Sequence, residues 1–209
     1  MILIGQYDSP FVRRVGIALS LYDMPYIHRP WSTFGDGAKI EPYNPLRRVP
    51  TLILDDGGVV IESSFILDYL DETQGEDALI ARSGPLRRKA LYYIALTVGF
   101  SDKCVALFYE KVLHKVTSDI WLDRLNTQIP AVLDVLEAIR ARIATTWLLG
   151  ERMGHADIAL GCALRHARDA HGDAIDWTRW PALAFHGASC EALDVFRTIS
   201  QPFTGPAGD

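Results

Sequence analysis

The chain has 209 residues, which is enough for one large domain or two small ones. Hydrophobic residues make up 49% and charged residues 22% of it, the balance of an ordinary soluble globular protein rather than a disordered or fibrous one. The formal net charge of −5 at pH 7 gives no reason to expect nucleic acid or an anionic membrane as a partner.

The N-terminal segment and the cysteines indicate where the protein acts. No basic leader opens the sequence, and no apolar run reaches the roughly 18 residues needed to span a bilayer, so we expect a cytoplasmic protein that does not enter the membrane. Cys104, Cys162 and Cys190 are odd in number and widely spaced, which argues against disulfides and CxxC motifs and favours small buried residues. No HExxH motif occurs, and His166 and His171 are poorly aligned on one helical face, so we expect no metal.

The first thirty residues predict a strand, a helix and a second strand. Residues 2–6 read as a short strand, and apolar residues then recur at helical spacing from Phe11 onward. Pro10 suits the first position of a helix and Ser9 is a good N-cap before it. Residues 26–29 predict the next strand.

The stretch from residue 44 to residue 70 predicts a hairpin followed by a helix. Residues 51–54 and 59–61 are rich in β-formers, and the Asp-Asp-Gly-Gly sequence between them is a strong turn signal. Val49-Pro50 precedes the hairpin, where a cis peptide is most plausible. Glu62-Ser63 follows it, at the start of a helix whose first amides lack partners and can receive an anion.

This order of elements resembles the thioredoxin-like domain of the cytosolic glutathione transferases, of the bacterial type with serine at the catalytic position. The resemblance implies a thioredoxin-like α/β domain over residues 1–77, which binds glutathione. It also implies an all-α bundle over residues 84–209, which contributes the electrophile pocket. Glutathione is then the co-substrate, and a homodimer is expected because the family commonly places its site beside a two-fold interface.

The resemblance assigns the contact with the glutathione sulfur to Ser9, at the N-terminus of the first helix. A helix N-terminus and a hydroxyl donor both favour a thiolate over a thiol. Tyr7 is the rival donor, because several classes of the family use a tyrosine near the end of this strand. No cysteine occurs at positions 7–11, so a mixed disulfide with glutathione cannot form there.

The resemblance also implies how the tripeptide is held. The Val49 backbone pairs with the cysteinyl residue like an added strand, next to Pro50, which offers no competing N–H donor. The hydroxyl and amide of Ser63 bind the γ-glutamyl carboxylate, and Glu62 is available for the α-amine. Arg48 can pair with the glycyl carboxylate. Each of these short motifs has a purely structural alternative, as a helix start or a solvated loop.

Further residues are candidates for the pocket without a firm role. Trp31 and Phe34 lie in a glycine-containing loop and are candidate walls for the electrophile pocket, although such aromatics more often pack a loop. Lys39 is a second candidate for the glycyl carboxylate. Phe108 and Tyr109 are candidates on the first long helix of the second domain.

The remainder of the chain predicts helices only. Long helical patterns run over about 86–112 and 118–144, the second with Pro130 as a kink. Near residue 155 the sequence resembles the start of the family's central helix, with Gly154 at the cap position and Asp157 as a structural residue. Residues 201–209 form a Pro/Gly tail that we expect to be loose.

We therefore expect a glutathione transferase that activates the glutathione thiol for attack on a small hydrophobic electrophile, as in detoxification. A glutathione-dependent isomerase of the zeta type is the alternative, since Ser9 followed by an arginine-containing helix resembles it, although its serine–cysteine run is missing. A third interpretation is a non-catalytic binding or interaction protein of the same fold. The retained Ser9, Val49-Pro50 and Glu62-Ser63 argue against that one.

Overall fold

The computed structural model describes residues 1–206, which form two compact units. The first unit contains Met1–Arg82 together with the segment that begins at Leu193, and the second contains Ser83–Ala192. The chain therefore leaves the first unit once and returns to it near its C-terminal end.

A four-stranded mixed sheet forms the centre of the first unit. Its strands are β1 (Ile2–Ile4), β2 (Ile27–Arg29), β3 (Thr51–Ile53) and β4 (Val59–Ile61). They lie in the order β2-β1-β3-β4, with β1 parallel to β2 and antiparallel to β3, and β3 antiparallel to β4. This is the sheet of a thioredoxin-like domain, and it confirms the predicted fold class for this part of the chain.

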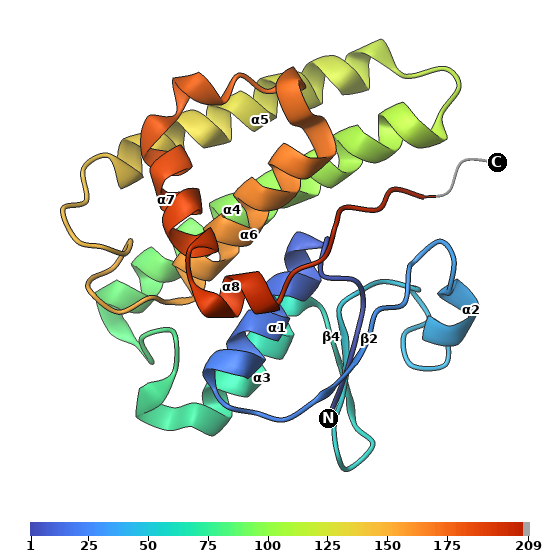
Figure 1. Ribbon diagram of the computed structural model, residues 1–209, viewed down its shortest axis with the longest axis vertical. Coiled ribbons are helices and arrows are strands. Elements are labelled where there is room, and N and C mark those ends of the chain that lie inside the picture. Colours follow the sequence, from blue (N-terminus) through green and yellow to red (C-terminus); the bar gives the residue numbers. More distant parts are fainter. Residues whose placement is uncertain (207–209) are drawn as a thin grey trace. The chain divides into compact units, whose positions relative to one another are not determined.

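Helices cover both faces of this sheet. The helices of the first half are α1 (Pro10–Leu21), α2 (Gly37–Ile40) and α3 (Ser63–Gln74), the last followed by the 3-10 turn η1 (Gly75–Asp77). Helices α1 and α3 pack against each other on one side, whereas α2 lies on the other side (Figure 1). Apolar residues of α1 such as Val12, Val15 and Leu19 are fully buried, so hydrophobic burial fixes this helix and the serine that precedes it.

The C-terminal segment corrects two of our expectations. We placed everything after residue 84 in the helical domain and expected residues 201–209 to be loose. Helix α8 (Asp194–Thr198) instead packs on α1 in the first unit. Arg13 donates from Nε to the carbonyl of Ile199 at 2.8 Å and from Nη2 to that of Phe196 at 2.7 Å. The reason is that a buried guanidinium needs acceptors, and these carbonyls supply them.

The chain beyond α8 is held as well. Gln201 accepts a hydrogen bond from the Tyr7 amide at 2.8 Å, and the Thr204 amide donates to the Asp8 carboxylate at 3.0 Å. Gln201 and Thr204 thus lie beside the loop that carries Ser9, while the last three residues of the predicted tail lie outside the described part of the chain.

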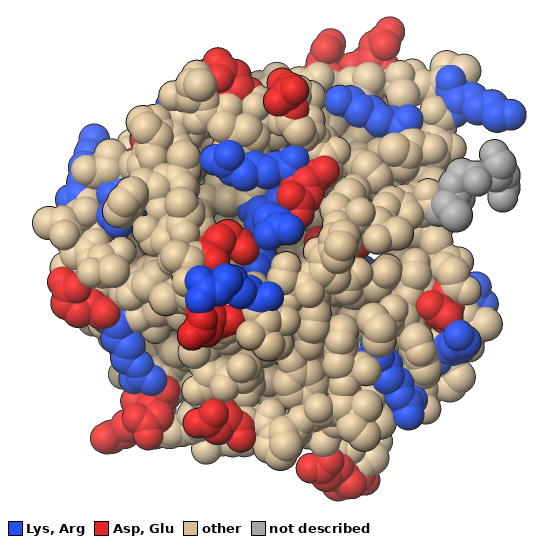
Figure 2. Space-filling model, viewed as in Figure 1, with Lys and Arg blue, Asp and Glu red and all other residues tan. Residues whose placement is uncertain are grey.

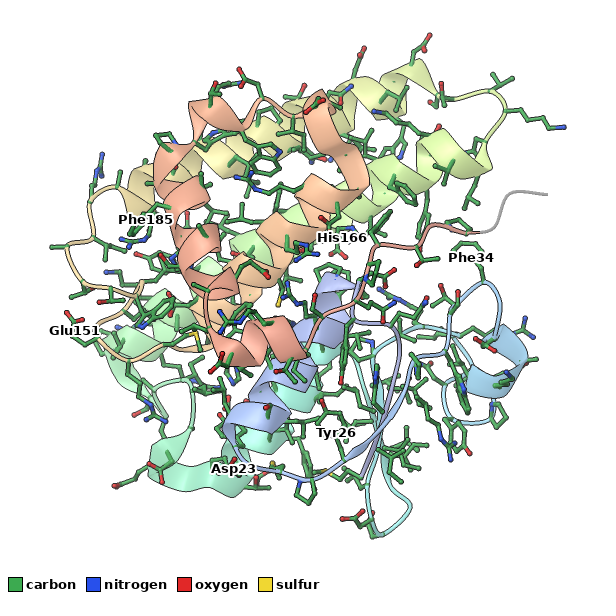
Figure 3. The ribbon with its side chains drawn as sticks, viewed as in Figure 1. Asp23, Tyr26, Phe34, Glu151, His166 and Phe185 are labelled. Carbon is green, nitrogen blue, oxygen red and sulfur yellow. The ribbon has the colours of Figure 1, made fainter. Side chains whose placement is uncertain are left out.

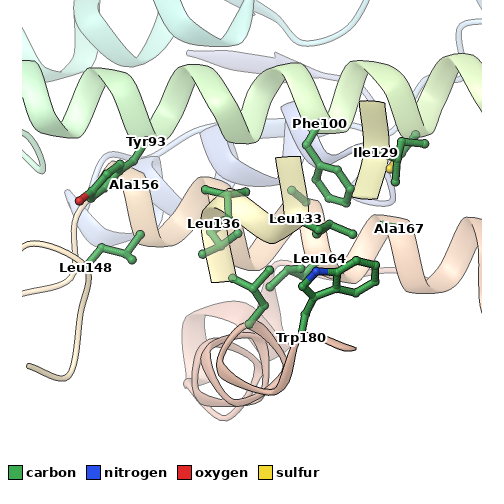
Figure 4. Close-up of a cluster of buried hydrophobic side chains, with 14 of the residues drawn as sticks. Tyr93, Phe100, Ile129, Leu133, Leu136, Leu148, Ala156, Leu164, Ala167 and Trp180 are labelled. Carbon is green, nitrogen blue, oxygen red and sulfur yellow. The ribbon is translucent and has the colours of Figure 1, made fainter. Parts of the chain in front are cut away.

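The second unit is a bundle of four helices with two short 3-10 turns, η2 (Gly172–Ala174) and η3 (Trp177–Arg179). Its helices are α4 (Gly84–Leu113), α5 (Asp119–Arg140), α6 (His155–His171) and α7 (Pro181–Glu191). Helix α6 is buried along most of its length and packs against α4 and α7. Figure 4 shows the shared core, in which side chains such as Phe100, Leu133 and Trp180 interlock.

The structure can be compared with three predictions for the helical part of the chain. Pro130 lies inside α5, which runs on through it. Asp157 accepts from the amides of Gly154 at 3.0 Å and of Leu148 at 2.8 Å, the structural role that we expected. Its carboxylate therefore closes the α6 N-terminus even though glycine occupies the cap. The three cysteines are all buried, also as expected.

One helix among the described residues, α4, is long and apolar enough by length and composition to cross a membrane. We had expected no such stretch. The core helix of a globular bundle passes the same test, and α4 packs along both α5 and α6.

Charged side chains of both signs are interspersed on the face drawn in Figure 2. Ion pairs follow the same pattern, since Arg165 contacts both Asp169 at 2.6 Å and Glu191 at 3.3 Å. Such partly exposed pairs contribute little to stability.

Candidate functional site

Ser9 caps the N-terminus of α1. Its backbone is extended, and its Oγ accepts a long hydrogen bond of 3.4 Å from the Val12 amide. The side chain is only partly buried, and accepting that bond leaves the hydroxyl hydrogen able to donate. The site thus combines an O–H donor with the positive end of a 12-residue helix.

Gly5 brings the start of α1 next to Val49. A Cβ placed on Gly5 would lie 2.5 Å from Cγ2 of Val12 and 2.8 Å from Cβ of Val49, and the residue has a φ of +129°. Both the space and the backbone conformation require glycine. The end of β1, the first turn of α1 and the segment before β3 therefore meet at this residue.

We predict that Gly5→Ala lowers the free energy of unfolding by about 2 kcal/mol, because alanine strains the backbone and pushes Val12 and Val49 apart. Urea denaturation followed by circular dichroism measures this. Gly57→Ala is the matched control, since Gly57 also has positive φ, +88°, but a Cβ there meets nothing within 4 Å. Equal losses in the two variants would show that close packing at Gly5 contributes nothing.

The main-chain amide and carbonyl of Val49 are available for hydrogen bonding. The Val49–Pro50 peptide is cis, and Val49 precedes β3 rather than belonging to it. Within residues 1–206, its amide and carbonyl form no hydrogen bond with other protein groups. The main chain of Val49 can therefore pair with an extended peptide, as strand addition requires.

Asn44 braces the loop that carries Arg48 and Val49, and sequence analysis missed it. The side chain is 1% exposed, and its Nδ2 donates to the Arg48 carbonyl at 3.0 Å and to Thr51 Oγ1 at 3.1 Å. Its Oδ1 accepts from the Leu46 amide at 3.1 Å. The Asn-Pro dipeptide is a turn signal, but nothing in it announces a buried side chain. The Arg48 side chain itself is exposed.

The N-terminus of α3 carries Glu62 and Ser63. Glu62 has a φ of 70°, an uncommon conformation for a residue other than glycine. Its Oε1 accepts from the Ser64 amide and from Ser63 Oγ, each at 3.0 Å. Ser63 is 1% exposed, so its hydroxyl is fixed, whereas Glu62 and Ser64 are exposed.

Arg14 lies beneath this helix end and was also missed. Its Nη2 donates to Ser63 Oγ at 2.7 Å and to Ser64 Oγ at 2.8 Å. The residue is 2% exposed. A charged residue inside the apolar run of a helix is a signal that sequence analysis could have used, because buried arginines occur where they have acceptors.

Tyr7, the rival of Ser9, is engaged elsewhere. Its hydroxyl hydrogen bonds with that of Tyr26 at 2.7 Å, and its ring stacks on His28 with centroids 3.8 Å apart; Figure 3 labels Tyr26 in the segment that leads into β2. Burial, and then the hydrogen bond with Tyr26, raise the pKa of Tyr7 above its ordinary value. This hydroxyl is a buried neutral group bonded to another tyrosine.

The loop before α2 holds the next three candidates. Trp31 packs against the small core of Ile4, Ile40 and Ile53, which is its structural role. Phe34 is 52% exposed (Figure 3). The ammonium of Lys39 pairs with Asp36 at 2.6 Å. That hydrogen bond from Lys39, followed by one from the Ser32 amide, lowers the pKa of Asp36.

Phe108 and Tyr109 lie on α4 in the second unit, with ring centroids 5.8 Å apart, and both are partly buried. The structure gives no further role to them. Among residues 1–206 there is no group of three or more His, Cys, Asp or Glu side chains placed to hold a metal ion.

The chain combines a thioredoxin-like unit with an all-helical unit. A serine precedes the first helix, and a Glu-Ser pair begins the third. This combination is typical of the class of two-domain proteins with a thioredoxin-like N-terminal domain. Two family descriptions match the chain: the N-terminal domain of glutathione S-transferases over residues 3–78 and the C-terminal domain over residues 119–184. Together they cover more than half of it. The chain belongs to the glutathione S-transferase family.

Individual relatives match along nearly the whole chain. Maleylacetoacetate isomerase of Pseudomonas aeruginosa is 29% identical, over 99% of this chain and 100% of that protein. A solved glutathione S-transferase of Methylobacterium radiotolerans, in complex with glutathione sulfonate, is 28% identical with a TM-score of 0.90, over 100% of this chain and 97% of that one. A transferase family member of Pseudomonas fluorescens with bound glutathione is 29% identical with a TM-score of 0.85, over 97% and 99%.

Proposed function

We propose that this protein is a glutathione S-transferase in which Ser9 stabilises the glutathione thiolate for attack on a small hydrophobic electrophile. The observation that carries the proposal is the meeting of three features in the first unit. These are the hydroxyl of Ser9 at the N-terminus of α1, the unused backbone of Val49 and the start of α3 at Glu62-Ser63. The solved relatives that contain glutathione or its sulfonate support it.

The first step is ionisation of the thiol. A free thiol has a pKa of about 8.5, so only a few per cent is ionised near neutral pH, and the thiolate is the nucleophile. A hydrogen bond from Ser9 Oγ–H and the positive end of α1 lower that pKa. The thiol proton leaves to solvent. The sulfur then forms a bond to an electrophilic carbon, and the leaving group departs with the bonding electrons.

The tripeptide is held at both of its ends. The Val49 amide and carbonyl pair with the cysteinyl residue as an added strand does. Ser63 and the first amides of α3 bind the γ-glutamyl carboxylate, and the Glu62 carboxylate takes the α-amine. Arg48, which is exposed beside Val49, pairs with the glycyl carboxylate. Of the two candidates for that last contact, Lys39 already pairs with Asp36.

Two measurements test the proposal. Isothermal titration with glutathione should show one site per chain, and turnover of 1-chloro-2,4-dinitrobenzene should consume glutathione and release chloride. A chain that binds no glutathione would instead favour a non-catalytic interaction protein. We also propose that the protein is cytoplasmic and forms a homodimer. Size-exclusion chromatography with light scattering measures the oligomeric state.

Isomerisation is the second candidate function, because a full-length relative is named a maleylacetoacetate isomerase. In that chemistry the same thiolate adds to a cis double bond, the carbon–carbon bond rotates, and expulsion of the thiolate leaves the trans product. Glutathione is then regenerated. Incubation with maleylacetoacetate separates the two reactions: isomer formation at constant glutathione supports isomerisation, and loss of glutathione supports conjugation.

A further inference from the structure

Resting on the proposed function, we propose that Arg14 is a positioning residue for glutathione. In this proposal Arg14 prepares the N-terminus of α3 to receive the γ-glutamyl carboxylate. Arg14 lies on α1, whereas the serines that it contacts lie on α3, and it is 2% exposed. A residue so deeply buried acts through the groups that it bonds rather than by contact with solvent or ligand.

The contacts of Arg14 fix which way two hydroxyls can point. Nη2 donates to Ser63 Oγ at 2.7 Å and to Ser64 Oγ at 2.8 Å. Arginine has donors only, so both serine oxygens must act as acceptors towards it. Each hydroxyl hydrogen then points away from the guanidinium. In Ser63 that hydrogen reaches Glu62 Oε1 at 3.0 Å.

The result is a helix end organised for an anion. The bonds from Arg14 turn the hydroxyl hydrogens of Ser63 and Ser64 away from the guanidinium, and in Ser63 that hydrogen already donates to the Glu62 carboxylate. This helix end therefore offers donors to a carboxylate. The guanidinium also places a full positive charge beneath the first turn of α3. Screening by solvent is weak at a buried position, so this charge adds to that of the helix N-terminus.

Arg13 provides a natural comparison within the same helix. It is also 2% exposed and positively charged, but its guanidinium bonds the carbonyls of Ile199 and Phe196. The two adjacent arginines therefore have separate tasks. Arg13 holds the C-terminal segment, and Arg14 holds the serines of α3.

The test compares three tripeptides by isothermal titration. Glutathione carries both the α-carboxylate and the α-amine, glutaryl-cysteinyl-glycine lacks the amine, and 4-aminobutanoyl-cysteinyl-glycine lacks the carboxylate. We expect Arg14→Met to weaken binding of glutathione and of the glutaryl peptide by about tenfold or more, since the serines lose their charged donor and the helix end loses a buried positive charge. Binding of the aminobutanoyl peptide should change by less than about threefold. Arg14→Lys, which keeps the charge, should restore part of the loss.

Arg13→Met is the matched control, and its affinities for the three peptides should keep the wild-type ratios. If Arg14→Met does not fold, Arg14→Gln carries the comparison, because it keeps an N–H donor for the serines and removes the charge. Equal weakening for all three peptides would mean that Arg14 is structural only and would overturn the proposal. Wild-type protein that binds none of the three peptides would overturn the proposed function itself, which is a different outcome.

Discussion

Replacing Ser9 with alanine is expected to lower kcat/KM for glutathione by about 100-fold or more, the usual effect of removing a hydrogen-bond donor that stabilises a developing or resident anion. In the proposed mechanism the Ser9 hydroxyl donates a hydrogen bond that is stronger to the thiolate than to the thiol, so it favours the ionised form. Without it the pKa of the bound thiol rises towards about 8.5. The pH–rate profile of the variant should therefore move to higher pH.

Steady-state kinetics with 1-chloro-2,4-dinitrobenzene between pH 6 and pH 9 measures both changes. The loss of the N-cap lowers stability by about 1 kcal/mol, so the assays need a temperature at which both proteins are folded. Ser20→Ala, an exposed serine on the same helix, is the control for a serine-to-alanine change. An unaltered pH profile in Ser9→Ala would remove the role that we assign to this hydroxyl.

Tyr7→Phe decides between the two candidate donors. The Tyr7 hydroxyl is bonded to Tyr26 at 2.7 Å, so its removal should cost about 1 kcal/mol of stability and change kcat/KM by less than about threefold. If Tyr7→Phe produced the larger kinetic loss, the sulfur contact would have to be reassigned.

The elements around the site could be predicted from the sequence because each has a local cause. Pro10 and Ser9 mark the start of α1, and the Asp-Asp-Gly-Gly turn marks the hairpin. These signals act over a few residues, so they survive in any tertiary context. The family resemblance then predicted that these elements form a thioredoxin-like sheet. The structure shows that sheet, with the strand order β2-β1-β3-β4.

The contacts that support the site could not be predicted because the residues that form them are distant in sequence. Arg14 bonds a serine 49 positions away, and Arg13 bonds Ile199 across 186 positions. Gly5 is required by two side chains that periodicity does not place together. The C-terminal segment was misassigned for the same reason: residues 194–199 supply acceptors to Arg13 in the first unit, and Gln201 and Thr204, in the expected loose tail, bond Tyr7 and Asp8.

A buried histidine in the helical unit should make the protein sensitive to acid. His186 on α7 is 0% exposed, its Nε2 lies 3.8 Å from Asp157 Oδ1, and its ring meets that of Trp147 edge-on. Burial, and then the charge of Arg140, lower the pKa of His186 to about 4. Near neutral pH the contact is therefore a neutral imidazole beside a carboxylate rather than an ion pair.

The direction of the effect follows from proton binding. In the unfolded chain the histidine has a pKa of about 6.5, so between that value and the folded value of about 4 the unfolded state binds a proton that the folded state does not. The free energy of unfolding thus falls as pH falls through this range, by about 2 kcal/mol between pH 7 and pH 5. Burial raises the pKa of Asp157 despite its hydrogen bonds from Leu148 and Gly154, and this opposes the loss at lower pH.

Urea denaturation at pH 7 and pH 5 measures the difference, and two variants assign it. His186→Gln should be less stable than the wild type at pH 7, because a buried ring is lost, but its stability should vary less with pH. Cys190→Ala removes another fully buried side chain of α7, so it should lower stability by a similar amount at both pH values. A His186→Gln variant that keeps the full wild-type loss between pH 7 and pH 5 would place the acid sensitivity in another group. If the variants assign the acid sensitivity to His186, the first region expected to open in acid is the N-terminus of α6, where Asp157 lies beside this histidine.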